Sequence, residues 1–448
     1  MKFSPSISLK YLPWYVLISS VFFSSIFIQY AALLFFLVAF FGSNKPVIKI
    51  NAFFIVVISL LIVSFASYLY NLINQLADVY TILFWLFSYV PPLVLILILQ
   101  TYSKGVDFIK IYKFYKLWVY LESFLMIFSA IKHGRYVVGD PATGTVGDAN
   151  WVAFHICVVL IYEISKFITL WKQKEITLKN GFKKISVIIY FFVILLIPES
   201  TANLGFLMIV LGVAFVVEFV VSNINFTRIL ILSISISLSF YLISQSFVYK
   251  RIDDAIEQLS TSNISKNPYL SKVYIYTKLI NGEIYSNTNW LLGSGPATFT
   301  SRSSVMRMPD ERVNEFPLEL PYFKSYLFKK YISPIYAGWR QTRESHGNFA
   351  SPQTSVISIA VELGVAGCLC VFALFYYIFK RISKLVFSDD KIYLKKFVFY
   401  LSLFYLINLF HLNFWEYPII TFTYFIFLFL ILKDSSVLSV SESDSPNM

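Results

Sequence analysis

The sequence predicts an all-α polytopic membrane protein, on three observations. Of its 448 residues, 57% are hydrophobic and 19% aromatic, and only 14% are charged, whereas about a quarter of the residues of a soluble domain are charged. The mean hydropathy is +0.68. The apolar residues form continuous stretches close to the roughly 20 residues with which a helix crosses a bilayer. Outer-membrane barrels instead show short segments of alternating polarity.

Each apolar run is expected to be a helix, because lipid offers no partner to backbone polar groups. Tyr11–Phe41 is long enough for a hairpin of two short helices that turns near Ser24 and Ser25; one tilted helix with an external N-terminus is the alternative. The adjacent prolines Pro91 and Pro92 should kink the third run. The runs are Tyr11–Phe41, Asn51–Tyr70, Tyr80–Gln100, Ile111–Ile131, Asn150–Ile168, Ile185–Pro198, Thr201–Val221, Thr227–Phe247, Gln353–Phe379, Phe397–Leu412 and Tyr417–Leu432.

The basic residues orient these helices. With the hairpin, most of the 37 lysines and arginines fall on one side, and the short loops of the other side hold only Lys132 and Arg135. This asymmetry predicts about twelve helices with both termini in the cytoplasm. Helices 1–9 lie in residues 1–247 and helices 10–12 in 351–433. Between them, 248–350 form one large extracytoplasmic loop, expected to be partly helical, and 434–448 form a cytoplasmic tail.

Several classes of function are not expected. The three cysteines lie in apolar runs and the four histidines are scattered, so the sequence has neither a disulfide framework nor a zinc pattern. No metal and no cofactor is predicted. The net charge is +12, but basic residues of a membrane protein are interpreted by their place relative to the bilayer, so no nucleic-acid partner is predicted. The first apolar run leads into further spans rather than a cleavage site, so no signal peptide is expected.

The segment richest in candidate site residues lies at the end of the large loop. Arg340 and Arg343 precede a helix start, where two guanidinium groups and the helix dipole can bind a diphosphate. His346 could be a general base for a hydroxyl group or a donor to a phosphate. The alternative is a solvated basic rim that holds the loop against anionic headgroups.

Two short outer loops add candidates. Arg135 could face an anion, or could be a cation that extends to the interface from a helix end. In the turn after Pro198, Glu199 could be a base or a hydrogen-bond anchor and Asn203 could bind a substrate; the alternative is a helix cap made by Ser200 and Thr201.

Three polar residues lie within the apolar runs themselves. Glu122 is mid-span, and is interpreted either as a neutral, hydrogen-bonded acid or as a functional group. His155 and His411 are expected to be core histidines with satisfied hydrogen bonds.

The order of these features resembles the O-antigen ligase and polymerase superfamily of bacterial surface-polysaccharide enzymes. The segment GTVGDANWVAF (144–154) is similar to the family's glycine-rich lead into a helix. Lys272–Tyr276 followed by Leu292–Pro296 looks like its Arg-x-x-x-Trp segment and Leu-Gly-x-Gly-Pro turn. Glu362-Leu-Gly-x-x-Gly367 matches its Glu-Leu-Gly-x-x-Gly helix. The resemblance implies a fold like that of the GT-C glycosyltransferases.

The departures from the family pattern favour a polymerase. Gln353 stands where the ligases place a histidine, and the turn that contains Asn203 lacks their arginine. Lys272 replaces an arginine, which keeps the charge but loses the bidentate fork.

The resemblance implies metal-independent glycosyl transfer from undecaprenyl diphosphate to a hydroxyl of another lipid-linked repeat unit, at the outer face of the inner membrane. The partners it implies are the undecaprenyl-diphosphate-linked oligosaccharide, the lipid bilayer and a chain-length regulator. The alternatives are a ligase that transfers the glycan to lipid A core, and a flippase or transporter of the same lipid. Transporters tend to have duplicated halves, and the sequence shows no internal repeat.

Overall fold

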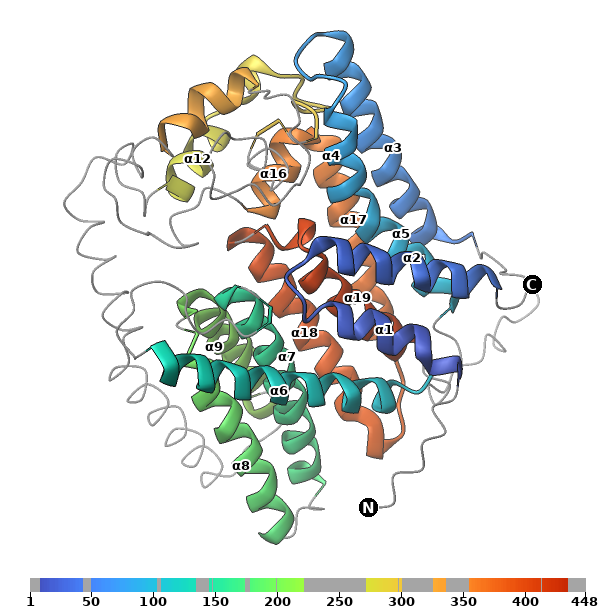
Figure 1. The fold of residues 1–448 in the computed structure, drawn as a ribbon, viewed down its shortest axis with the longest axis vertical. Helices are drawn as coiled ribbons and strands as arrows, with labels where there is room; N and C mark the ends of the chain where they lie inside the picture. Colours follow the sequence, from blue (N-terminus) through green and yellow to red (C-terminus); the bar gives the residue numbers. More distant parts are fainter. Residues whose placement is uncertain are drawn as a thin grey trace, which may run out of the picture.

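The computed structural model describes twelve stretches of the chain, which are almost entirely helical and contain no β-strand. They are residues 9–42, 50–102, 106–133, 145–146, 148–173, 178–198, 200–220, 271–296, 298–299, 325–335, 354–411 and 413–433. The α-helices (Figure 1) are α1 (Leu12–Ser20), α2 (Ile26–Gly42), α3 (Ala52–Ile73), α4 (Thr81–Ser88), α5 (Val90–Tyr102), α6 (Phe108–His133), α7 (Ala149–Lys172), α8 (Leu178–Leu195), α9 (Thr201–Phe215), α12 (Ser271–Ile280), α16 (Ser355–Glu362), α17 (Gly364–Ser383), α18 (Ile392–His411) and α19 (Pro418–Leu432).

Five spans in the described residues are long and apolar enough to cross a membrane: Ala52–Ile73, Thr81–Gln100, Ala149–Lys172, Gly364–Ser383 and Asp389–His411. Shorter apolar helices cover Ile26–Gly42, Ala202–Glu218 and Pro418–Leu432. Large apolar side chains are exposed on the outer faces of several helices, for example Leu34, Ile62, Phe124 and Phe372. A helical, membrane-embedded protein explains both facts. The full set of twelve spans stays a prediction, and the run Thr227–Phe247 lies outside the described residues.

Two of the predicted breaks are confirmed. The first apolar run forms two helices, α1 and α2, joined by a turn at residues 21–25, and Trp14 packs edge-on against Phe36 with ring centroids 4.9 Å apart. The third run divides into α4 and α5. Pro91 and Pro92 lie in the first turn of α5, where a missing N–H costs no helical hydrogen bond.

The prediction of one helix over Gln353–Phe379 is wrong. The described part of this run forms α16 and α17, which are separated at Leu363. Gly364 has φ +64°, in the left-handed region that ends a helix and that glycine adopts without strain.

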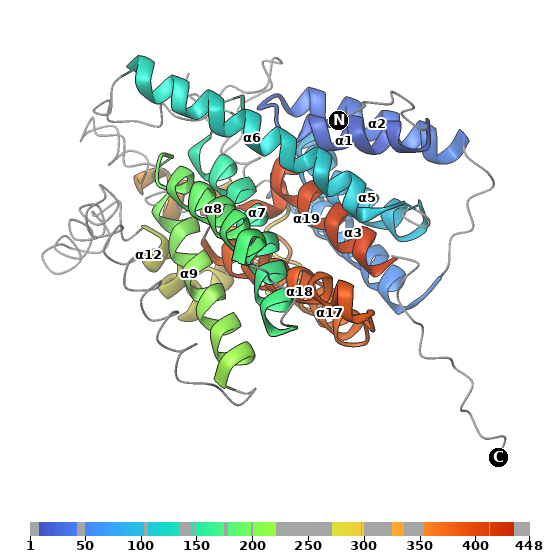
Figure 2. The same cartoon turned by 90° about the horizontal axis from the view of Figure 1, so that it is seen from below.

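Helix α19 lies in the middle of the molecule (Figure 2). It contacts α2, α5, α6, α7 and α18, and every residue from Pro418 to Ile431 is buried. Tyr424 of α19 stacks on Tyr405 of α18, with ring centroids 4.1 Å apart. A helix that is apolar on all sides is expected to be enclosed by other helices.

The helix ends that adjoin basic segments lie together. Lys110 at the start of α6 lies over the ring of Tyr11, 5.2 Å from its centroid, next to the start of α1. Arg381 at the end of α17 lies over the ring of Phe53 at the start of α3, at 4.8 Å. We call this the lysine-rich end of the molecule. The opposite end carries α12 and α16 (Figure 1) and is called the loop end.

A small second hydrophobic core lies at the loop end. Its buried side chains come from the described parts of the predicted large loop and from α16, whose residues Ile357 and Val361 join it. The loop residues in this core are Ile275, Ile284, Phe299, Leu327, Phe328, Tyr331, Ile332 and Ile335. Helix α16 therefore attaches the loop to the helix bundle.

Candidate functional site

Two of the motifs that carry the family resemblance meet at the loop end. The turn Leu292–Pro296 lies against the break between α16 and α17. Ser294 N donates to Val361 O at 2.8 Å, and Gly295 N donates to Glu362 O at 3.0 Å. The contact is made by main-chain atoms of segments almost seventy residues apart in the sequence, so a reading of either motif alone does not reveal it.

Glycine is required on both sides of this contact. Gly293 has φ +74°, and a Cβ atom added there would lie 2.5 Å from Val361 O. A Cβ added to Gly364 would lie 2.5 Å from Leu291 O. Any side chain at either position would separate the two segments.

The side chain of Glu362 connects the turn to other parts of the bundle. It is fully buried; Oε2 accepts a hydrogen bond from Tyr89 OH at 3.1 Å, and Oε1 accepts one from Phe299 N at 2.9 Å. The backbone oxygen of Glu362 also accepts from Ser67 Oγ of α3 at 2.8 Å. Glu362 thus fixes the loop to helix α3 and to Tyr89, the residue between α4 and α5.

Lys272 also lies at the loop end, on α12 (Figure 1). Its side chain is buried, with 8% of the residue exposed, and its Nζ is 3.4 Å from His411 Nδ1 at the end of α18. Burial lowers the pKa of Lys272 to about 7, because the charged ammonium loses its hydration.

The prediction of His411 as a satisfied core histidine is confirmed in part: it has a hydrogen-bond partner, but it lies at the edge of the core. His411 is half-buried, contacts Lys272, and meets the ring of Phe206 of α9 edge-on at 5.4 Å. One feature of the sequence indicates that His411 lies at a helix end: the polar residues Asn413 and Glu416 follow it and separate two apolar runs.

Tyr276 fixes α12, one turn beyond Lys272. Its hydroxyl donates to Phe410 O at 2.9 Å and lies 3.3 Å from Thr354 Oγ1. Thr354 in turn caps α16 by accepting from Ile357 N at 3.1 Å. Sequence reasoning did not select Tyr276 or Thr354, because their partners lie on other helices.

Asn203 joins the start of α9 to α7. It is fully buried, and its Nδ2 donates to Asn150 O and to Ser200 Oγ, both at 3.0 Å. Ser200 Oγ donates to Asn150 Oδ1 at 2.7 Å and does not cap α9. The alternative of a cap by Ser200 is therefore wrong. Asn203 Oδ1 is buried without a hydrogen-bond partner among the described residues.

Together, Lys272, Tyr276, Thr354 and His411 form a polar site at the loop end, which we call the Lys272 cluster. With a pKa near 7, Lys272 is present in both protonation states at neutral pH. Its ammonium form can bind an anionic oxygen, and its amine form can accept a proton. In the part of the chain that the structure describes, no group of three His, Cys, Asp or Glu side chains could hold a metal ion.

Of the candidate site residues from the sequence, the structure describes Lys272 and Asn203. The others lie outside the described residues, and they are Arg135, Glu199, Arg340, Arg343, His346 and Gln353.

The two remaining polar residues of the apolar runs have structural partners. Glu122 Oε2 accepts from Thr145 N at 2.9 Å and the Thr145 hydroxyl contacts its other oxygen, so Glu122 holds the segment before α7. His155 is buried, with Nδ1 2.8 Å from Tyr115 OH, which confirms it as a core histidine.

No protein-family model matches the chain, and no curated protein shows a significant match to it.

Proposed function

We propose that this protein polymerises lipid-linked repeat units of O-antigen or a related surface polysaccharide. It would transfer the growing glycan from undecaprenyl diphosphate to a hydroxyl of another lipid-linked repeat unit, at the outer face of the bacterial inner membrane. The main support is the buried Lys272 at the loop end, on α12 and in contact with the end of α18. The same end carries a turn of the kind found in that superfamily.

The chemistry requires a cation near the leaving group. The bond between the anomeric carbon and the diphosphate oxygen breaks, and the departing negative charge is stabilised by a fixed cation in a site of low polarity. Lys272 has this role in the proposal, with Arg135, Arg340 and Arg343 as further cations. Asn203 and Gln353 would bind the sugar or the diphosphate.

A base must take the proton of the acceptor hydroxyl as the new glycosidic bond forms. His346 is the first candidate for this base and Glu199 the second. Neither a metal nor a nucleotide sugar is required, because the lipid diphosphate is already an activated leaving group.

Deletion of the gene tests the proposal against its first alternative. Loss of a polymerase leaves ligation intact, so the deletion strain should make lipopolysaccharide that carries a single repeat unit. Loss of a ligase would give bare core, with long polymer accumulating on undecaprenyl diphosphate. Loss of a flippase would give bare core with single repeat units retained in the inner leaflet. Unchanged lipopolysaccharide and capsule would contradict all three functions.

A pair of lysine variants tests the site. Lys272→Met should abolish polymer while protein level is unchanged, and Lys272→Arg should retain part of it, because the charge is kept. Lys278→Met is the matched control: Lys278 lies on the same helix, but it is partly exposed and bonded to Glu283 at 2.7 Å. If the Lys272→Met and Lys278→Met variants make equal amounts of polymer, Lys272 is not part of the site.

A further inference from the structure

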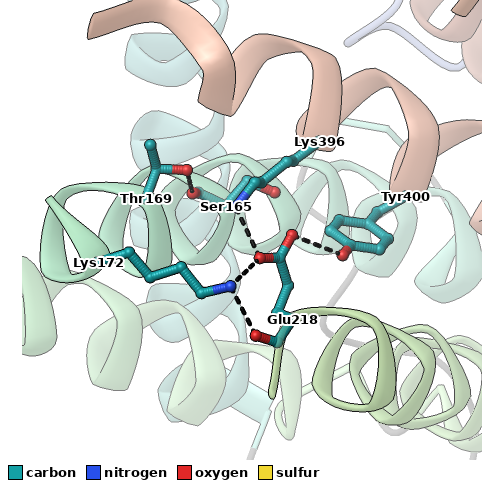
Figure 3. Close-up of polar contacts among 6 residues, drawn as sticks. All are labelled: Ser165, Thr169, Lys172, Glu218, Lys396 and Tyr400. Atoms are coloured by element: carbon teal, nitrogen blue, oxygen red, sulfur yellow. Dashed lines mark hydrogen bonds and ion pairs between the residues drawn. The ribbon is translucent and has the colours of Figure 1, made fainter. Parts of the chain in front are cut away.

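A second polar cluster lies at the lysine-rich end, far from the Lys272 cluster. Glu218 is on the π-helical turn Val216–Val220 that follows α9, and only 7% of the residue is exposed. Its Oε2 accepts hydrogen bonds from Lys172 Nζ and Lys396 Nζ, both at 2.7 Å, and Tyr400 OH donates to Oε1 at 3.4 Å. Figure 3 shows the two lysines reaching this carboxylate from α7 and from α18.

A cavity of about 300 Å³ lies beside this bridge, between the end of α7 and the start of α18. This volume is at the lower limit for small-molecule sites. The lining residues are Thr169, Lys172, Gln173, Asp389, Ile392 and Lys396.

The lining carries charges of both signs. Lys172 and Lys396 contribute ammonium groups, each with three N–H donors. Lys172 donates to Glu218 twice, to the backbone oxygen at 2.6 Å and to Oε2 at 2.7 Å, whereas Lys396 donates to Oε2 alone. Among the described residues this leaves Lys396 donors for a ligand. Asp389 contributes a carboxylate. Gln173 donates through Nε2 to Asp389 O at 2.6 Å, whereas its Oε1 is buried without a partner in the described part of the chain. A ligand that satisfies this lining needs anionic oxygens and also N–H or O–H donors.

The place of the cavity indicates the source of such a ligand. It lies where the candidate spans Ala149–Lys172 and Asp389–His411 reach their polar ends. Lipid headgroups are found at this level of a bilayer. A phosphate and a primary ammonium on one small headgroup occur together in phosphatidylethanolamine.

We propose that this cavity binds the headgroup of phosphatidylethanolamine. The phosphate oxygens accept hydrogen bonds from Lys396 and lie near the positive charge of Lys172, and the primary ammonium donates to Gln173 Oε1 and the Asp389 carboxylate. The bridge to Glu218 keeps both lysines at the cavity wall. This site is independent of the proposed polymerase function and of the Lys272 cluster.

Native mass spectrometry of the full chain in detergent tests the proposal. The protein is mixed with equal amounts of phosphatidylethanolamine, phosphatidylcholine and phosphatidylglycerol. Retention of phosphatidylethanolamine should exceed that of phosphatidylcholine roughly tenfold, because a quaternary ammonium has no N–H to donate. Equal retention of these two lipids, or preferential retention of phosphatidylglycerol, would overturn the assignment.

Two variants locate the binding in this cavity. Lys396→Met should reduce retention of phosphatidylethanolamine, while Lys172 still pairs with Glu218. Gln173→Leu, at a partly exposed helix end, should remove the preference over phosphatidylcholine without a threat to folding. The matched control is Lys110→Met, also at the lysine-rich end but directed at the Tyr11 ring. Wild-type retention in both cavity variants would overturn the proposal.

Soluble competitors separate a lipid from a free phosphate compound. Phosphoethanolamine and inorganic phosphate should displace the lipid only at concentrations far above that of the lipid, because they lack acyl chains. Displacement at equal concentration would assign the cavity to a soluble phosphate ligand and overturn the lipid assignment.

Discussion

Lys272 and Glu362 are both buried ionisable residues at the loop end. Glu362 accepts hydrogen bonds from Tyr89 and from Phe299 N, one at each carboxylate oxygen. Lys272 Nζ lies 3.4 Å from His411 Nδ1, and burial lowers the pKa of its ammonium group. We therefore expect the hydrogen bonds of Glu362 to contribute to stability and the burial of the Lys272 ammonium to reduce it.

The stability of the protein should rise with pH because of Lys272. Its pKa is about 7 when folded, against an ordinary value of 10.5. Between these two values the unfolded chain binds more protons, so the free energy of unfolding increases with pH in this window and levels off below it. The melting temperature in detergent should therefore rise from pH 7 to pH 9. Lys272→Met should reduce this rise and Lys278→Met should not; equal slopes in the two variants would contradict the burial effect.

Removal of the Glu362 carboxylate should destabilise the loop end. Glu362→Ala leaves two buried donors without an acceptor, at a cost of about 3 kcal/mol. Glu283→Ala is the control, because that carboxylate is 42% exposed in its pair with Lys278 and should cost less than about 1 kcal/mol. Unfolding of the two variants in detergent, followed by near-ultraviolet circular dichroism, measures the difference. If Glu362→Ala lowers the free energy of unfolding no more than Glu283→Ala does, this prediction is contradicted.

Sequence reasoning located some of the site residues and missed others for a physical reason. Lys272 and Asn203 were found, because one lies in a motif and the other in a short polar turn. The partner of His411 was not predicted, since Lys272 is 139 residues away on another helix. Only tertiary packing distinguishes a histidine at a helix end from one in a core.

At the scale of elements, the long apolar runs predicted helices because composition alone decides that structure in lipid. The division between α16 and α17 was not predicted. Gly364 and Gly367 stand in an apolar stretch that is typical of a continuous helix. What ends α16 is the approach of Leu291, more than seventy residues earlier, whose oxygen accepts from Ala366 N at 3.1 Å.

Alanine variants at two glycines should separate backbone strain from steric contact. Gly282 and Gly364 both have positive φ, but a Cβ at Gly282 meets nothing within 4 Å, whereas one at Gly364 would lie 2.5 Å from Leu291 O. Gly282→Ala should cost about 1 kcal/mol for its backbone conformation. Gly364→Ala should cost more, and should expose the loop to limited proteolysis. Equal melting temperatures for the two variants would show that the contact does not hold the loop.

At the scale of the whole molecule, the lysine-rich end and the loop end give the topology prediction a structural basis. Basic residues gather on the cytoplasmic side of membrane proteins. The lysine-rich end should therefore face the cytoplasm, and the loop end with the Lys272 cluster should face outward.

Fusions of alkaline phosphatase test this orientation, because the enzyme is active only outside the cytoplasm. A fusion after Lys433 should be inactive, and one within Ser260–Lys266 should be active. A cytoplasmic reporter such as green fluorescent protein should give the opposite pattern at the same sites. If both reporters indicate a cytoplasmic loop, the orientation and the proposed place of the reaction are wrong.

The central position of α19 has a consequence for biogenesis. The helices that enclose α19 all precede it in the chain. The ribosome therefore synthesises this central helix after the helices that surround it. Until Pro418–Leu432 enters the membrane, the faces of α5, α7 and α18 that contact α19 are open, and lipid or an insertase must cover them. A chain cut just before Pro418 would lack its centre and would be a substrate for membrane proteases. Late nonsense mutations should thus be as harmful to this protein as early ones.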